Sequence, residues 1–202
     1  KRVIVSLFGR NGDQREHDRV VRRQRQMCIR DENDTMESVT QIYGETLIAT
    51  LNEDRKTLRK AVKDSNELFY QARERKYEVM PTLQKLHNNY IESGHYYVQV
   101  VDYMSEVTKA LVHITRPCFE HINNNHEGCT KDQVEDLMYI NGEVARIFDR
   151  INVMLRSNDF MDIEQVLRMR DKLFVDLDEV MKKQLRRIKS KATSTKASML
   201  YL

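Results

Sequence analysis

The sequence predicts an all-α protein, an elongated antiparallel helical bundle. The 202 residues include only six Gly, two Pro and 7% aromatic residues, whereas a β-sandwich of this length would contain more turn residues and more Val, Thr and aromatic residues. From residue 36 onward, apolar residues recur at three- and four-residue steps, which is typical of amphipathic helices. No stretch approaches the roughly 18 apolar residues of a membrane-spanning helix.

The N-terminal residues 1–34 are predicted to form a basic linker or arm. They are rich in Arg, Asp and Asn and lack a sustained apolar period. Residues 25–31 resemble the translation of a sequencing adapter, so part of the arm is suspected to be artefactual and no function is inferred from residues before 32. The bundle is therefore expected to occupy residues 35–202.

Three helices are predicted for the first half of the bundle. Residues 36–51 carry one apolar stripe and residues 58–90 a second, longer one, which Pro81 should kink or interrupt and Ser93-Gly94 should end. The third helix spans about residues 97–122. The residues within about 60° of Met104 on its wheel form the expected packed side: Tyr97, Val100, Val101, Val107, Thr108, Leu111, Cys118, Phe119 and Ile122.

Helix-capping patterns predict where the last three helices begin. Thr130 with Gln133 forms a capping box before a fourth helix, and Asp162 with Gln165 forms another before a fifth. Thr193 or Ser194 is expected to cap a sixth helix.

The fifth helix is expected to pack with its whole apolar side, which includes Leu185 and Ile188 near its basic end. Short loops force neighbouring helices to run antiparallel. We therefore expect two three-helix halves, with the last helix truncated at Leu202. Because the sequence starts at Lys1 and ends in an amphipathic helix, we expect the parent polypeptide to continue in both directions.

The charge is distributed unevenly along the chain. The total is +3, but residues 1–30 carry +6 and residues 182–202 carry +7, which leaves −10 on the residues between them. The basic residues at the end of the fifth helix are candidates for contact with an anionic membrane or a partner, or else they only compensate the helix dipole. These residues are Lys182, Lys183, Arg186, Arg187, Lys189 and Lys191. No aromatic residues interleave them, so nucleic acid is not an expected partner.

Acidic pairs at i and i+4 are the candidate metal ligands. Asp132 with Asp136 and Asp102 with Glu106 share helix faces in this way. Random placement of the acids in this part of the chain gives about five such pairs, so the spacing alone is weak evidence. A metal ion is therefore kept as an open alternative to no cofactor at all.

A second polar cluster lies at the end of the third helix and includes His121, Asn125 and His126. It has two readings: these residues satisfy the carbonyl groups of the helix end, or they form a ligand or partner site. The three cysteines form neither a disulfide framework nor a zinc site, and Cys118 is expected to be a buried apolar residue. No nucleotide-binding or hydrolase motif is present, and we predict no catalytic activity.

Three stretches of the sequence resemble one known family. Residues 92–103, residues 116–126 and the tail of residues 184–188 and 194–202 resemble the C-terminal PhoU-like domain of bacterial inorganic phosphate transporters, in particular the long phosphate permeases of Bacteroidetes. The resemblance covers about residues 35–202. It implies a membrane-embedded phosphate permease followed by a helical domain of repeated three-helix units on the cytoplasmic side of the inner membrane, which regulates transport.

The resemblance also implies a site that this sequence matches only in part. PhoU proteins can bind metal clusters through acidic (E/D)xxxD motifs, and here Asp132 and Asp136 match that form, while Asp102 is followed by Glu106 and the usual preceding Arg is absent. The implied partner is the transmembrane transporter domain of the same polypeptide, and a second copy of the chain is a further candidate. The alternative functions are a free-standing PhoU-like scaffold for a signalling partner and, from another class, a metal-dependent helical enzyme.

Overall fold

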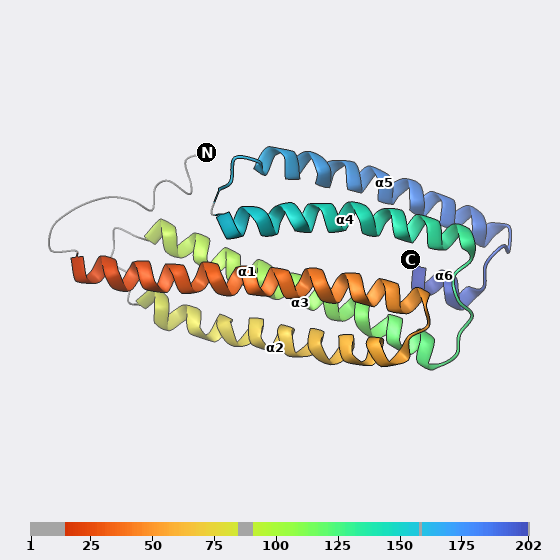
Figure 1. The fold of residues 1–202 in the computed structure, drawn as a ribbon, viewed down its shortest axis with the longest axis horizontal. Helices are drawn as coiled ribbons and strands as arrows, with labels where there is room; N and C mark the ends of the chain where they lie inside the picture. Colours follow the sequence, from red (N-terminus) through yellow and green to blue (C-terminus); the bar gives the residue numbers. More distant parts are fainter. Residues whose placement is uncertain (1–14, 85–90, 158, 202) are drawn as a thin grey trace.

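The structure is a computed structural model that describes residues 15–84, 91–157 and 159–201. All regular structure in these ranges is helical, and the helices lie side by side along one long axis (Figure 1). They are α1 (Arg15–Leu51), α2 (Arg55–Gln84), α3 (Ile91–Asn123), α4 (Lys131–Ser157), α5 (Ile163–Lys189) and α6 (Thr195–Tyr201). The predicted all-α bundle is confirmed at this level. None of the described helices is long and apolar enough to span a bilayer.

The first helix is longer than the sequence pattern indicated. It begins at Arg15 and runs without interruption past residue 35, so the predicted arm is helical from Arg15 onward. Propensity explains this, because residues 15–35 lack apolar periodicity but about half of them are the good helix formers Arg, Gln, Glu and Met. A domain boundary at residue 35 stays a prediction.

The first three helices pack on one another to form a closed unit. One cluster contains Val39, Ile42, Ala61, Leu68 and Leu111, and a second contains Ala49, Leu58, Cys118 and Ile122. The predicted packed side of α3 is confirmed, while Asp102 and Glu106 on its other side are exposed. Two buried hydroxyl groups, of Ser65 and Thr115, lie 2.8 Å apart and satisfy each other.

The connection between α2 and α3 differs from the prediction. Helix α2 continues through Pro81 to Gln84, so within the described residues the proline does not interrupt the helix, and a kink there stays a prediction. The predicted stop at Ser93-Gly94 is wrong, because α3 begins at Ile91 and contains both residues. Gly94 is buried there, and packing offsets the helix cost of about 1 kcal/mol for glycine. The predicted continuation of the stripe through residues 85–90 lies outside the described residues.

Three helices are followed by a residue in the left-handed conformation: Glu53 (φ 55°) after α1, Asn125 (φ 53°) after α3 and Lys191 (φ 56°) after α5. In each case the next amide donates to the carbonyl five residues back, for example His126 N to His121 O at 3.1 Å. Glycine and asparagine are the usual residues at this position. Glu53 and Lys191 therefore hold a strained conformation.

The fourth and fifth helices form a hairpin beside α1 (Figure 1). Ile147, Met154 and Val166 form its apolar cluster. The Thr130–Gln133 capping box is confirmed, since the Thr130 amide donates to the Gln133 side chain at 2.8 Å. The box predicted at Asp162 is wrong: its side chain makes no capping bond, because its carboxylate pairs with a cross-helix arginine.

The short helix α6 lies at one end of the bundle, against α3 and α5. Ser194 caps it, and its hydroxyl accepts a hydrogen bond from Ala197 N at 3.2 Å. Leu200 packs on the α1–α3 cluster that contains Leu58. The short helix therefore ties the hairpin to the closed unit.

Candidate functional site

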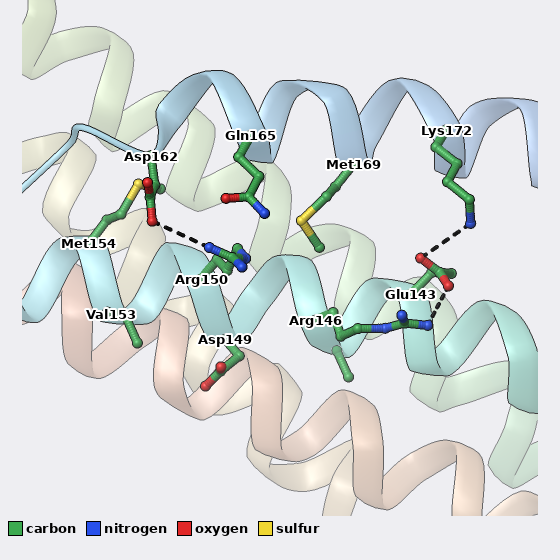
Figure 2. A pocket seen from close by; sticks show the side chains of 11 residues that line it. Glu143, Arg146, Asp149, Arg150, Val153, Met154, Asp162, Gln165, Met169 and Lys172 are labelled. Carbon is green, nitrogen blue, oxygen red and sulfur yellow. Dashed lines mark hydrogen bonds and ion pairs between the residues drawn. The ribbon is translucent and has the colours of Figure 1, made fainter.

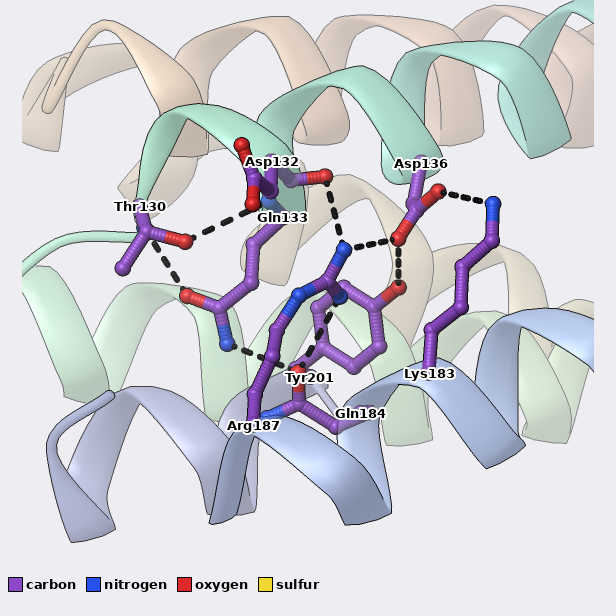
Figure 3. A network of polar contacts seen from close by, with 8 residues as sticks. All are labelled: Thr130, Asp132, Gln133, Asp136, Lys183, Gln184, Arg187 and Tyr201. Atoms are coloured by element: carbon purple, nitrogen blue, oxygen red, sulfur yellow. Dashed lines mark hydrogen bonds and ion pairs between the residues drawn. The ribbon is translucent and has the colours of Figure 1, made fainter. Parts of the chain in front are cut away.

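A polar junction joins α4, α5 and α6 at the end of the hairpin (Figure 3). We use this name for Gln133, Asp136, Lys183, Gln184, Arg187 and Tyr201. At its centre, the carboxylate of Asp136 accepts hydrogen bonds from Arg187 at 2.6 Å and Lys183 at 3.1 Å. The Tyr201 hydroxyl donates to the same carboxylate at 3.3 Å. One acid of α4 thus holds two cations of α5 and one phenol of α6.

The titration behaviour of the junction follows from this geometry. Burial alone would raise the pKa of Asp136, but the hydrogen bonds from Arg187 and Lys183 outweigh it and hold the pKa below the ordinary value. Burial raises the pKa of Tyr201 to about 12. Asp136 is therefore ionised and Tyr201 is neutral at physiological pH, which suits a permanent structural connection.

Two glutamine side chains form the innermost part of the junction. Gln133 and Gln184 are fully buried, and the Gln133 amide donates to the Gln184 carbonyl oxygen at 3.2 Å. Gln133 also closes the capping box, so one side chain both starts α4 and joins it to α5. The side-chain amide nitrogen of Gln184 has no partner among the described residues.

One side of the α4–α5 seam is a groove of about 830 Å³ that is lined by both apolar and charged side chains (Figure 2). Its charges neutralise one another: Arg150 lies 3.3 Å from Asp162, and the buried carboxylate of Glu143 contacts Arg146 and, at 3.6 Å, Lys172. Because each cation of the groove faces an acid, the groove offers little net attraction for an anion.

The other side of the seam exposes a row of apolar side chains on α5, interrupted by Arg170, which we call the α5 stripe. All of its members are 38–62% exposed: Ile163, Leu167, Phe174, Leu177, Met181, Leu185 and Ile188. At 100° per residue they lie within an arc of about 80°. Val166, Val180 and Gln184 lie on the adjacent side, buried against the rest of the molecule.

The prediction that the whole apolar side of α5 packs is therefore wrong for Leu185 and Ile188, which are exposed. The reason is the number of neighbours. Helix α5 packs on α4 along its length and on α6 at its end, and it makes at most marginal contact with any other described helix. One neighbouring helix covers only part of an apolar arc this wide.

The predicted metal ligands are not brought together. Asp136 is held by two cations, Asp132 is exposed, Asp102 pairs with Lys76 at 2.9 Å, and Glu106 pairs with Lys109. Within the described residues, no group of three or more His, Cys, Asp and Glu side chains is placed to hold a metal ion. Asp132 and Asp136 share a helix, but the cations of α5 stand where a metal would bind.

The predicted cluster at the end of α3 is a helix terminus. His121 is 5% exposed and its Nε2 lies 2.9 Å from the carbonyl oxygen of Glu127, while its ring contacts the His126 ring edge-on. Asn125 occupies the left-handed position and accepts a hydrogen bond from Arg55. The backbone amides of Asn125 and His126 donate to the carbonyl groups of Ile122 and His121, which favours the helix-end interpretation, although the side chains themselves make other contacts. Cys118 is buried as predicted, and burial raises the pKa of its thiol.

The predicted basic residues divide into two groups. Lys183 and Arg187 are held in the polar junction, and Lys182 pairs with Asp178 at 2.5 Å. Arg186, Lys189 and Lys191 are exposed. Only the second group is available for an outside contact without breaking a bond inside the molecule.

Sequence reasoning missed Gln184 and Glu143, both buried polar residues of the hairpin. A glutamine in the apolar line of α5 was the signal for the first, because a polar residue at a packed position requires a buried partner.

Comparison with known proteins found no family model, no curated protein and no solved structure that matches this chain.

Proposed function

We propose that this chain is a PhoU-like regulatory domain of an inorganic phosphate transporter. In this proposal, helices α1–α3 form one three-helix half and α4–α6 belong to a second, on the cytoplasmic side of the membrane. The partner is the transporter's transmembrane domain in the same polypeptide. The resemblance of residues 92–103, 116–126 and the C-terminal tail supports the proposal, as does the elongated all-helical bundle.

The observation that carries the proposal is the α5 stripe. Isolated apolar residues on a surface need no explanation, but seven exposed apolar side chains along one side of a helix of 27 residues mark an interaction site. The polar junction fixes the end of α5, so this surface is presented by a helix that is anchored to the rest of the molecule. A regulatory domain that acts by protein contact requires such a surface.

Phosphate uptake in cells tests this function. The substitution Phe174→Asp, made in the chromosomal gene, places a charge in the α5 stripe. Val175→Asp is the matched control: Val175 is 60% exposed, against 62% for Phe174, and its side chain points about 100° away from that of Phe174.

We expect Phe174→Asp to change the rate of phosphate uptake, or its response to phosphate starvation, and Val175→Asp to leave both unchanged. Uptake by the Phe174→Asp strain that equals the parental rate in both phosphate-rich and phosphate-poor medium would reject a role in transport.

A further inference from the structure

The α5 stripe is bordered by charges that change sign along the helix. Glu164 and Asp171 flank its first half, and Lys182 and Lys189 flank its second half. At 100° per residue these four positions lie within about 20° of one another, so they form a single row beside the stripe. The row is acidic at one end of α5 and basic at the other, and Asp178, which lies about 20–40° nearer the stripe, is paired with Lys182.

This arrangement is self-complementary for two α5 helices that pack antiparallel. If a twofold axis passes between Asp176 and Leu177, Glu164 faces Lys189 of the second copy and Asp171 faces its Lys182, because the members of each pair are equally far from the axis. Twofold symmetry repeats both contacts. Four oppositely charged pairs then border the contact.

The same axis places apolar residues opposite apolar residues. The distances of Leu167 and Leu185 from the axis differ by one residue. Those of Ile163 and Ile188, and those of Phe174 and Leu177, differ by two residues, which is about 3 Å along the helix. The three- and four-residue steps of the α5 stripe are those of a helix-packing seam. One register therefore satisfies both the apolar row and the charged row.

The ion pairs that these charged residues form within one chain do not oppose the antiparallel packing of two α5 helices. Lys182 pairs with Asp178, and Asp171 pairs with Arg170 at 2.6 Å, and all four side chains are at least half exposed. Exposed pairs of this kind contribute little to stability and exchange partners readily. Arg170 lies in the line of the stripe, and its long side chain can keep the guanidinium at the edge of the contact.

We propose that the α5 stripe binds the α5 stripe of a second copy of this chain, antiparallel, to form a twofold-symmetric dimer. The inference rests on the proposed function only in that the α5 stripe is a contact surface. It names a second copy of the chain as the molecule that this surface contacts. An anionic membrane accounts less well for the surface, because Glu164 and Asp171 flank half of the stripe and a negatively charged surface repels them.

Charge reversal tests the register. The acid-reversed variant carries Glu164→Lys and Asp171→Lys, and the base-reversed variant carries Lys182→Glu and Lys189→Glu. Sedimentation velocity is measured for the native chain, for each variant and for their equimolar mixture, from low to high micromolar concentration. Circular dichroism confirms that each variant remains helical.

We expect the native chain to form dimers reversibly, and each variant alone to dimerise more weakly by about tenfold or more because like charges then face one another. The mixture should recover dimers, since the reversed charges of one variant face opposite charges of the other. Phe174→Asp should remove the dimer, and Val175→Asp, which lies at the edge of the contact beyond the charged row, should weaken it much less.

A native chain that stays monomeric throughout, or a mixture that recovers no dimer, would overturn the proposal. The proposal would also be overturned, in favour of a lipid surface, if the monomer binds anionic phosphatidylglycerol vesicles and Phe174→Asp abolishes that binding. Dimer formation and phosphate uptake are separate readouts: a dimer without an effect on uptake rejects the regulatory function, and an effect on uptake without a dimer rejects this inference.

Discussion

The closed unit of α1–α3 is built from helices of 30–37 residues and the α4–α5 hairpin from two more strongly amphipathic helices of 27 residues, and the two regions differ in how far their apolar sides are covered. Each helix of the closed unit packs against two others, and Leu58 and Ser65 are completely buried. Helix α5 has one long neighbour and leaves eight large apolar side chains 38–62% exposed. The number of helices packed around an apolar residue, rather than the amphipathic pattern, therefore decides how much that residue contributes to the stability of the fold.

The largest expected difference between the two regions is in the effect of shortening an apolar side chain. Leu58→Ala should lower the free energy of unfolding by about 3 kcal/mol, because it leaves a cavity in a closed core. Phe174→Ala should change it by less than about 0.5 kcal/mol in dilute solution, because Phe174 is exposed in the single chain. Urea denaturation measures both, and a loss of comparable size at the two positions would show that α5 is covered within one chain.

The polar junction is expected to stabilise the hairpin. Asp136→Asn leaves Arg187 and Lys183 without their acid, and we expect a loss of about 2 kcal/mol. Asp178→Asn removes an acid from an exposed pair with Lys182 and should cost less than about 0.5 kcal/mol.

Amide hydrogen exchange locates the effect. Asp136→Asn should speed exchange at the start of α4 and the end of α5, and leave the centre of α2 unchanged. Equal acceleration in both regions would mean that the junction does not act on the hairpin alone.

Acid should remove this contribution from the hairpin. The pKa of Asp136 is lowered in the folded chain, so its stabilisation is fully present above the ordinary value of 3.8 and is lost as the pH falls from there through the lower pKa of the folded state. The difference in unfolding free energy between the native chain and Asp136→Asn should therefore be constant near about pH 7 and shrink below about pH 4. Denaturation across this range measures it, and a difference that grows as the pH falls would contradict the assigned charges.

A smaller, stabilising effect is expected at the end of α1. Glu53→Gly relieves the left-handed conformation and should raise the free energy of unfolding by about 1 kcal/mol. Glu53→Ala keeps the strain and is the control. If both substitutions have the same effect in thermal unfolding, then the side chain of Glu53, and not its backbone, is what matters there.

Local patterns made much of the fold predictable. The packed side of α3, the burial of Cys118 and the Thr130–Gln133 box depend on residues within a few positions of one another, and all are confirmed. The stop at Ser93-Gly94 failed because tertiary packing can retain a glycine inside a helix.

The candidate site was less predictable because its contacts are distant in the sequence. Spacing within α4 indicated Asp136 as a metal ligand, but Lys183 and Arg187, which hold its carboxylate, come 47 and 51 residues later. The periodicity of α5 identified its apolar residues and could not state how many neighbours would cover them. The α5 stripe is the part of the pattern that the single chain leaves uncovered.

The most direct test of whether the α5 stripe is a contact surface is hydroxyl-radical labelling of the chain at increasing concentration. Phe174 and Met181 lie in the stripe, and Met161, which is 78% exposed, lies outside it. We predict that labelling of Phe174 and Met181 falls as the concentration rises while labelling of Met161 stays constant. Labelling of all three residues that is independent of concentration would contradict the account.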